Sequence, residues 1–253
     1  MKKIGLIDSG IGGLTLLKEL MDHKVHAEYL YISDSKNVPY GERSQAFMLN
    51  QVRDMSLKLI AKKVEVIILA CNTLTAETID TLRLELAVPI VGLEPYINYL
   101  NQDFAIDSKM ALILTEATFK STRFQTLLID KDPEHKIDIY PLKKLAMILE
   151  SLTIKDFESI RVEVERELMQ VEGRGYTHLI LGCTHYPIIK NFLESYLDLI
   201  VVDSAAAVRN HVMNSVEFIT TDKYHDTFLY NSDNSETWLS SKLSELKFLR
   251  DIV

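Results

Sequence analysis

The sequence contains few cysteines, no long apolar run and no basic cluster, and each of these features excludes a class of protein. Two cysteines in 253 residues cannot form a disulfide scaffold, so we expect free thiols in a reducing compartment. No apolar run reaches the roughly 18 residues that span a bilayer, so no membrane partner is expected. The formal net charge is −8, and without a Lys/Arg cluster nucleic acid is not an expected partner.

The N-terminal segment has no secretory leader pattern. Lys2 and Lys3 provide a basic start, but the apolar stretch that follows meets Asp8 too early for a signal peptide. We therefore expect a cytoplasmic protein. The composition, 47% hydrophobic and 25% charged, is that of an ordinary globular protein, and the length fits one large α/β domain or two small lobes.

Short apolar runs alternate with amphipathic segments of helical length. Runs typical of strands buried on both faces are 4–7, 27–32, 64–70, 88–92, 110–114, 177–182 and 199–202. The helical segments are 12–22, 44–62, 75–86, 117–128, 142–150, 155–172, 186–196 and 204–217. This alternation predicts an α/β fold with doubly wound, mainly parallel strands. Segment 225–231 adds a further strand, and 234–248 is predicted to be a closing helix.

Two places along the chain indicate a passage between lobes. Pro95 and the polar stretch 98–103 predict the start of a second lobe, and the chain is expected to cross back near Asp203. Residues 1–95 together with about 206–253 would then form the first α/β lobe. Residues from about 96 to 205 would form the second.

Small polar groups and both thiols follow predicted strands, at the edge where open α/β sheets bind ligands. These residues are Asp8, Ser9 and Gly10 after the first strand, Asp34 and then Val38–Gly41 after the second, Cys71, Asn72 and Thr73 after the third, and Cys183, Thr184 and His185 after strand 177–182. The sequence therefore predicts a polar site that contains both cysteines.

The glycines at 10, 12 and 13 follow a strand and precede a helix, which is similar to a dinucleotide-binding loop. The spacing differs, because the third glycine of that motif would fall at Thr15. We instead interpret the segment as a tight turn that brings backbone N–H groups and the Ser9 hydroxyl close to a small anion such as a carboxylate.

Each cysteine follows a buried strand and a small residue and precedes hydroxyl or amide groups that open a helix. A helix N-terminus lowers the pKa of a thiol, so this placement predicts two activated thiols, Cys71 and Cys183. A free cysteine is often simply a buried, inert residue. Two of them at strand ends, each followed by polar residues, favour a chemical role.

His185 is open to three interpretations: a metal ligand, a proton donor or a structural histidine. A Cys-x-His pair supplies too few ligands for a structural zinc site, and no second Cys/His cluster is nearby in sequence, so no metal is expected. His185 beside Cys183, and Asp8 near Cys71, are candidate proton partners for the two thiols. A Cys–His pair for acyl transfer remains an alternative, although it leaves the other cysteine without a role.

With these residues in place, the chain resembles the glutamate racemases of the aspartate/glutamate racemase superfamily. The motifs that carry the resemblance occur in order from residue 4 to about 208, and the segment beyond matches only loosely. They are Asp8–Thr15, Val38–Gly41, Ala70–Thr73, Val91–Pro95, Thr115–Thr118, Leu181–Pro187 and Val202–Ala205.

The resemblance implies two pseudo-symmetric lobes, each a mainly parallel sheet flanked by helices, with the active site in the cleft between them. It implies a small-molecule substrate, L- or D-glutamate, whose enantiomers are interconverted without cofactor or metal. The product D-glutamate would supply bacterial peptidoglycan synthesis, and thereby cell-wall biogenesis and cell shape. Members of the family are commonly dimers, so a homodimer is the expected assembly.

The resemblance also implies residue roles. Cys71 would deprotonate D-glutamate and Cys183 L-glutamate, assisted by Asp8 and His185 respectively, while Glu150 stands where the family has a carboxylate near the site. The residues implied to bind substrate are Asp8, Ser9, Pro39, Tyr40, Gly41, Asn72, Thr73, Thr118, Thr184 and His185.

Four positions depart from the family pattern, namely Leu74, Tyr96, Leu114 and Met147. Both thiols are retained, but these departures affect how far substrate specificity, subunit packing and the role of Glu150 can be inferred from the resemblance. Three other functions remain open: a racemase of another acidic amino acid such as aspartate, a non-catalytic binding paralogue, and a dithiol oxidoreductase. His185 favours glutamate, and a binding protein would need neither thiol. An oxidoreductase would need the two sulfur atoms within bonding distance.

Overall fold

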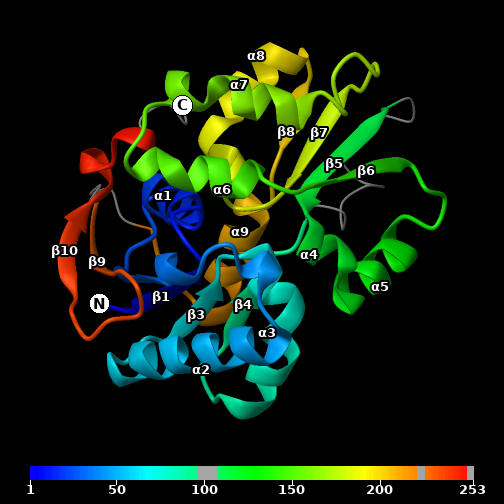
Figure 1. Ribbon diagram of the computed structural model, residues 1–253. Coiled ribbons are helices and arrows are strands. Elements are labelled where there is room, and N and C mark those ends of the chain that lie inside the picture. Colours follow the sequence, from blue (N-terminus) through cyan, green and yellow to red (C-terminus); the bar gives the residue numbers. More distant parts are fainter. Residues whose placement is uncertain (96–107, 221–225, 250–253) are drawn as a thin grey trace.

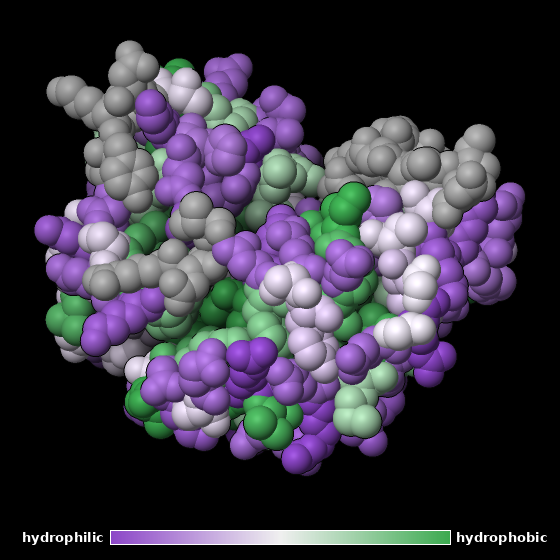
Figure 2. Space-filling model, turned by 90° about the horizontal axis from the view of Figure 1, so that it is seen from above, coloured by the Kyte–Doolittle hydropathy of each residue, from purple (hydrophilic) through white to green (hydrophobic). Residues whose placement is uncertain are grey.

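The computed structural model, which describes residues 1–95, 108–220 and 226–249, contains two separate β-sheets flanked by helices (Figure 1). Seen from above, the surface is mostly hydrophilic, with apolar side chains gathered in a hollow near its middle (Figure 2). In the described ranges, no helix is both long and apolar enough to cross a bilayer.

The first sheet has six strands in the order β10-β9-β2-β1-β3-β4. Its strands are β1 (Lys3–Asp8), β2 (Glu28–Ser33), β3 (Val66–Leu69), β4 (Ile90–Gly92), β9 (Thr227–Asn231) and β10 (Leu239–Lys242). All neighbours pair in parallel except β9 and β10, which are antiparallel. β1 lies between β2 and β3, and its residues from Ile4 onward are buried, as the continuous apolar run predicts.

The second sheet has four parallel strands in the order β6-β5-β7-β8. They are β5 (Met110–Thr115), β6 (Ile137–Leu142), β7 (His178–Gly182) and β8 (Ile200–Val202). The predicted α/β class, with parallel sheets flanked by helices, is therefore confirmed.

Helices cover both sheets. We call the six-stranded sheet with α1 (Leu14–Asp22), α2 (Gln45–Ala61), α3 (Asn72–Glu85) and α9 (Ala205–Val216) the first lobe. The second lobe is the four-stranded sheet with α4 (Glu116–Lys120), α5 (Thr122–Lys131), α6 (Leu145–Glu150), α7 (Phe157–Leu168) and α8 (Lys190–Leu197).

The segment predicted as one helix over 117–128 is two helices. Ser121 has an extended backbone and ends α4, and its hydroxyl then accepts a hydrogen bond from the Phe124 backbone N–H and caps α5. Serine is well suited to this position because its side chain replaces a hydrogen bond that the first turn of a helix lacks.

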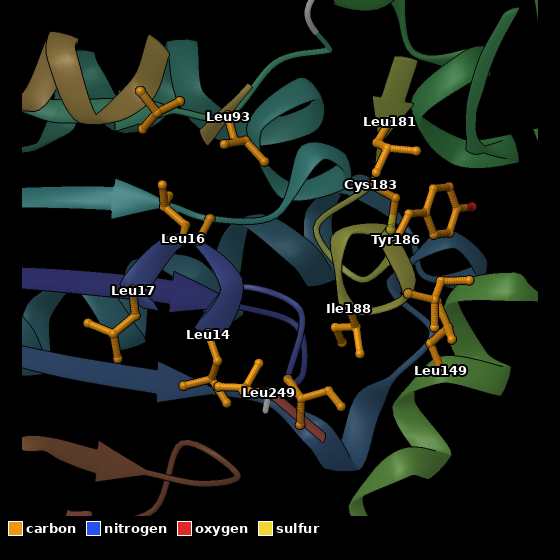
Figure 3. Packing of buried hydrophobic residues seen from close by; sticks show 14 of the residues in the cluster. Leu14, Leu16, Leu17, Leu93, Leu149, Leu181, Cys183, Tyr186, Ile188 and Leu249 are labelled. Atoms are coloured by element: carbon orange, nitrogen blue, oxygen red, sulfur yellow. The ribbon is translucent and has the colours of Figure 1, made fainter. Parts of the chain in front are cut away.

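One hydrophobic cluster runs through both lobes and places them against each other. It includes Leu14, Leu16 and Leu17 from α1, and Leu181 and Leu149 from the second lobe (Figure 3). Two smaller clusters lie elsewhere, one that includes buried side chains of β1, β3, α2 and α3, and one that includes those of β5 and α5. The shared cluster holds the carboxyl ends of β1, β3 and β7 close to the boundary between the lobes.

The prediction of a closing helix over 234–248 is wrong. The structure has β10 there, followed by 3₁₀ turns at Leu243–Glu245 and Lys247–Leu249. Asp233 and Asn234 adopt positive φ angles, which reverse the chain so that Leu239 pairs with Tyr230 of β9. Pairing with an existing strand therefore outweighs the helical spacing of the apolar residues.

Strand β6 was not predicted from the sequence. Pro141 lies within it and cannot donate to a sheet, and Asp138 interrupts its apolar residues. The strand is tolerated because it lies at an edge of the second sheet.

The first sheet takes strands from both ends of the chain, whereas the second is built from residues between them. The domain boundaries expected near residues 95 and 206 remain a prediction. The polar stretch 98–103, which partly motivated the first boundary, lies outside the described residues.

Candidate active site

Three strand ends deliver the chemical groups of the site. β1 ends at Asp8, Cys71 follows β3 and precedes α3, and Cys183 follows β7. The glycine loop after Asp8 meets the second lobe so closely that a Cβ added at Gly12 would lie 2.5 Å from the Thr184 Oγ1 atom and 2.6 Å from the His185 Nδ1 atom. A glycine is therefore required where the lobes touch.

Both cysteines are free and buried, with 7% and 8% of their surface exposed for Cys71 and Cys183. The Cys71 sulfur lies 3.6 Å from the Ser9 hydroxyl, and the Cys183 sulfur lies 3.8 Å from the His185 Nδ1 atom. Thr184, the residue after Cys183, donates its hydroxyl to Asp8 at 3.2 Å, so the strand ends of the two lobes meet. The structure thus brings one thiol from each lobe to the same boundary, and each has a polar partner.

The expectation of a lowered thiol pKa is wrong for Cys71. Burial, together with the nearby Asp8 carboxylate, raises the pKa of this thiol to about 12, because the Leu74 backbone N–H and the Ser9 hydroxyl lower it too little to compensate. Cys71 does cap α3, but the cost of burying a thiolate exceeds the effect of the helix N-terminus. In the free protein Cys71 is a neutral thiol.

His185 and Glu150 form a buried ion pair behind Cys183. The His185 Nε2 atom lies 2.6 Å from the Glu150 Oε2 atom, which also accepts a hydrogen bond of 3.0 Å from the Ile11 backbone N–H. Burial lowers the pKa of His185, but hydrogen bonds and charge interactions with Cys183 and Glu150 raise it well above its ordinary value. Burial raises the pKa of Glu150, and His185 and Ile11 bring it below its ordinary value. An imidazolium that faces Cys183 is therefore the favoured state.

Asp8 is fully buried at the first strand end. Its carboxylate accepts hydrogen bonds from the Gly10 backbone N–H at 2.8 Å and from the Thr184 hydroxyl at 3.2 Å. Burial raises the pKa of Asp8 to about 6, although the His185 charge and the Gly10 N–H oppose the shift. The N–H groups of Gly10 and Ile11 thus bind carboxylates of the protein itself and are not free for an external anion, unlike the loop interpretation from the sequence.

The raised pKa of Asp8 predicts a pH-dependent cost in stability. The native state holds the Asp8 proton up to about pH 6, whereas the unfolded chain loses it near 3.8, so ionisation lowers the free energy of unfolding as pH rises between these values. The expected loss is about 3 kcal/mol. Urea unfolding of the wild type and of Asp8→Asn between pH 4 and 7 measures it. The difference between the two proteins should change with pH in this window, and parallel curves would contradict the assignment.

The predicted substrate-binding turn at residues 39–41 lies on the first lobe and faces the second. Tyr40 is buried, and its hydroxyl donates to Asp34 at 2.7 Å. A Cβ added at Gly41 would be 3.4 Å from the Ala117 Cβ atom of α4. Pro39 directly precedes the 3₁₀ turn Tyr40–Glu42. Asp34 therefore anchors the turn through its hydrogen bond with Tyr40. The sequence predicted Asp34 at a strand end but did not predict this contact.

Threonine hydroxyls of the two lobes contact each other at the start of α3. The Thr73 hydroxyl lies 3.1 Å from that of Thr115 and 3.2 Å from that of Thr118. The neighbouring Asn72 donates through Nδ2 to the Leu93 carbonyl at 3.4 Å, while its buried Oδ1 atom has no hydrogen-bond partner among the described residues. Sequence reasoning included Thr73, Thr118 and Asn72 but missed Thr115, although its motif was recognised.

Both leucines among the four unusual positions lie in the cores of the lobes. Leu74 is fully buried in the cluster that includes residues of α2 and α3, and Leu114 in the one that includes residues of β5 and α5. Met147 is 48% exposed on α6, and Tyr96 lies outside the described residues. In the described part of the chain, no group of three His, Cys, Asp or Glu side chains is placed to hold a metal ion.

Comparisons with known proteins agree on one family. A family model described as Asp/Glu/Hydantoin racemase matches residues 16–212. A glutamate racemase of Lactobacillus helveticus is 34% identical over 215 residues, which cover 84% of this chain and 80% of that protein.

Solved structures extend the likeness to the fold. The glutamate racemase of Francisella tularensis, solved with D-glutamate, has a TM-score of 0.70 and 28% identity, and the match covers 91% of this chain and 87% of that chain. The Escherichia coli enzyme, solved with L-glutamate and an activator, has a TM-score of 0.79 at 24% identity, over 91% of this chain and 88% of that one. The second comparison concerns the fold alone.

Proposed function

This chain belongs to the Asp/Glu/Hydantoin racemase family, and we propose that it is a glutamate racemase that interconverts L- and D-glutamate by two-thiol proton transfer without a cofactor. The observation that carries the proposal is the pair of free thiols, Cys71 and Cys183, one from each lobe, each beside its own polar partner. The D-glutamate formed would supply peptidoglycan synthesis. No observation favours aspartate as the substrate.

In the conversion of L-glutamate, Cys183 is the proposed base. The His185 Nδ1 atom lies 3.8 Å from its sulfur, so an imidazolium there would stabilise the thiolate form that takes the α-proton. Cys71, a neutral thiol in the free protein, donates its proton to the opposite face of the α-carbon. Each proton removed from one face is thus matched by a proton delivered to the other, and charge is conserved.

Conversion of D-glutamate needs the reverse charge state, with Cys71 as the thiolate. Burial and Asp8 oppose that state in the free protein. The ammonium group of a bound amino acid would bring a positive charge beside Cys71 and favour the thiolate. Asp8, with a pKa of about 6, can hold or release a proton close to neutral pH and is the group suited to assist Cys71.

The weak acidity of an α-proton sets the other requirement of the site. A carbanionic transition state needs fixed hydrogen-bond donors and few water molecules. Both thiols are less than a tenth exposed, which supports a dry site. Ser9, the turn at 39–41, Asn72, Thr73, Thr118 and Thr184 are the groups proposed to hold the amino and carboxylate groups, and the unpaired Asn72 Oδ1 atom is an acceptor suited to the ammonium.

Two further properties remain predictions. A homodimer is proposed on the family resemblance, and a cytoplasmic location on the reduced state expected for the two thiols. Size-exclusion chromatography with light scattering would test the first, and a fluorescent fusion in cells the second.

The reaction is tested with purified, reduced protein and L-glutamate or L-aspartate in D₂O, without added cofactor. Circular dichroism follows the loss of optical activity, and NMR follows deuteration of the α-carbon. We expect both signals to change with glutamate only. Change with aspartate alone would keep the mechanism and overturn the substrate, and no change with either amino acid would overturn the proposed function.

A further inference from the structure

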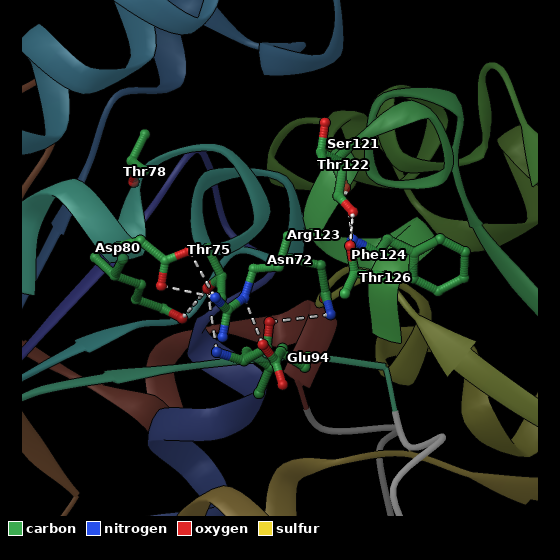
Figure 4. A network of polar contacts seen from close by, with 12 residues as sticks. Asn72, Thr75, Thr78, Asp80, Glu94, Ser121, Thr122, Arg123, Phe124 and Thr126 are labelled. Carbon is green, nitrogen blue, oxygen red and sulfur yellow. Dashed lines mark hydrogen bonds and ion pairs between the residues drawn. The ribbon is translucent and has the colours of Figure 1, made fainter. Parts of the chain in front are cut away.

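Arg123 joins the two lobes on the outside of the site. It lies in the first turn of α5, in the second lobe, and its guanidinium donates through Nη1 to both carboxylate oxygens of Asp80 on α3, at 2.8 and 2.9 Å. Its Nε atom donates to Glu94, the second residue after β4, at 2.6 Å (Figure 4). One side chain of the second lobe therefore holds two carboxylates of the first.

The helix that Arg123 grips also carries part of the candidate site. α3 begins directly after Cys71, and its second residue, Thr73, contacts Thr115 and Thr118 of the second lobe. Asp80 follows Thr73 by two helical turns, about 10 Å along the axis. α3 is thus fastened to the second lobe at two points, one inside the site and one outside it.

The arrangement described is closed. With Cys71 and Cys183 less than a tenth exposed, an amino acid cannot reach both thiols unless the lobes separate. Separation at α3 must break the hydroxyl contacts of Thr73 and the ion pairs of Arg123. The second group is the more accessible, because the Arg123 side chain is 27% and the Asp80 side chain 73% exposed.

We propose that Arg123 is a positioning residue that holds the lobes closed and thereby sets how often the two thiols become accessible to solvent and substrate. The kinetic part of this inference rests on the proposed function, whereas the accessibility part does not. Arg123 acts through α3 and does not touch the reacting atoms.

An isolated ion pair on a protein surface contributes little to stability. Arg123 makes three hydrogen bonds to two carboxylates, and these join the two lobes. We therefore expect its loss to raise the open population by about threefold to tenfold. A pair of the same chemistry inside one lobe should not affect opening.

The chain offers such a control. Arg53 on α2 donates from Nε and Nη2 to the two carboxylate oxygens of Glu85, both at 2.8 Å, and Glu85 also lies on α3. This pair fastens α3 within the first lobe. Arg53→Ala therefore removes a comparable ion pair from the same helix without releasing it from the second lobe.

The first test measures alkylation of Cys71 and Cys183 by iodoacetamide at one fixed pH, with mass spectrometry to quantify each thiol. Alkylation is expected to be about threefold to tenfold faster in Arg123→Ala, and faster in Asp80→Asn, than in the wild type. Alkylation should also be faster in Arg123→Lys, which keeps the charge but cannot hydrogen-bond both Asp80 and Glu94 in the same way. Arg53→Ala should match the wild type, and circular dichroism with thermal unfolding checks that each variant is folded.

Salt and kinetics provide the second test. Because the pairs are partly exposed, raising the salt concentration should speed alkylation of the wild type but not of Arg123→Ala. In the racemase assay, KM should fall for both enantiomers, by up to about tenfold, because the open state that admits substrate is more populated.

The possible outcomes distinguish the role of Arg123 from the proposed racemase function. Equal alkylation rates in folded Arg123→Ala, Arg53→Ala and the wild type would overturn the role of Arg123, whatever the activity. Faster alkylation in Arg123→Ala without racemisation by any protein would leave that role standing and overturn the proposed function.

Discussion

Replacing either Cys71 or Cys183 by alanine is expected to lower the rate of glutamate racemisation by at least about a thousandfold. General acid–base groups contribute about 10² to 10⁴ in rate, and here each thiol is both the base in one direction and the acid in the other. The thiols stand at the ends of β3 and β7 in different lobes, so neither can serve both faces of the α-carbon. Circular dichroism with each enantiomer measures the loss.

The two variants should also differ in which enantiomer they still deuterate. Cys183→Ala retains Cys71 and should exchange the α-hydrogen of D-glutamate slowly, with retention of configuration, while Cys71→Ala should do so with L-glutamate. NMR in D₂O, followed by chiral analysis, distinguishes the two. Racemisation at the wild-type rate in either variant would eliminate the two-thiol mechanism.

Replacing Glu150 by glutamine is expected to have the second largest effect, about a hundredfold loss of kcat with L-glutamate and a smaller loss with D-glutamate. Glu150 accepts from the Ile11 N–H and keeps His185 protonated beside Cys183. Without the carboxylate, the pKa of His185 falls toward its ordinary value, so the imidazolium is lost at a lower pH. The alkaline limb of the activity profile with L-glutamate should therefore move to lower pH.

A matched control for this substitution is Glu28→Gln, which removes a carboxylate from a surface ion pair with Lys3. It should leave both the rate and the pH profile unchanged. An unshifted profile in Glu150→Gln, in a variant that folds normally, would contradict the proposed function of the ion pair.

The parts of the fold that the sequence predicts well are those with a strong local signal. The run at 4–7 is apolar throughout, as expected of a strand in the middle of its sheet, and β1 lies there. The glycine loop at 10–13 was recognisable in the sequence, and at Gly12 the close approach of Thr184 and His185 permits no side chain. The placement of Cys71 and Cys183 after strands also followed from pattern alone.

The parts that could not be predicted depend on partners distant in sequence. β10 forms because β9 is available to pair with it, whereas its own residues have helical spacing. The pKa of Cys71 depends on its burial and on Asp8, and neither can be read from the residues that surround Cys71 in sequence. Thr115 becomes relevant only because its hydroxyl meets Thr73 from the other lobe.

The position of β9 in the first sheet also bears on how the chain folds during its synthesis. β2 pairs with β1 on one side and with β9 on the other, so that Leu30 meets Leu229 with most of the chain between them. While the ribosome makes the intervening residues, the outer edge of β2 exposes unpaired N–H and C=O groups that can recruit strands of other nascent chains. The last strands to be translated close that edge, so ribosome-bound chains truncated before Thr227 should be the form of this protein most prone to aggregate.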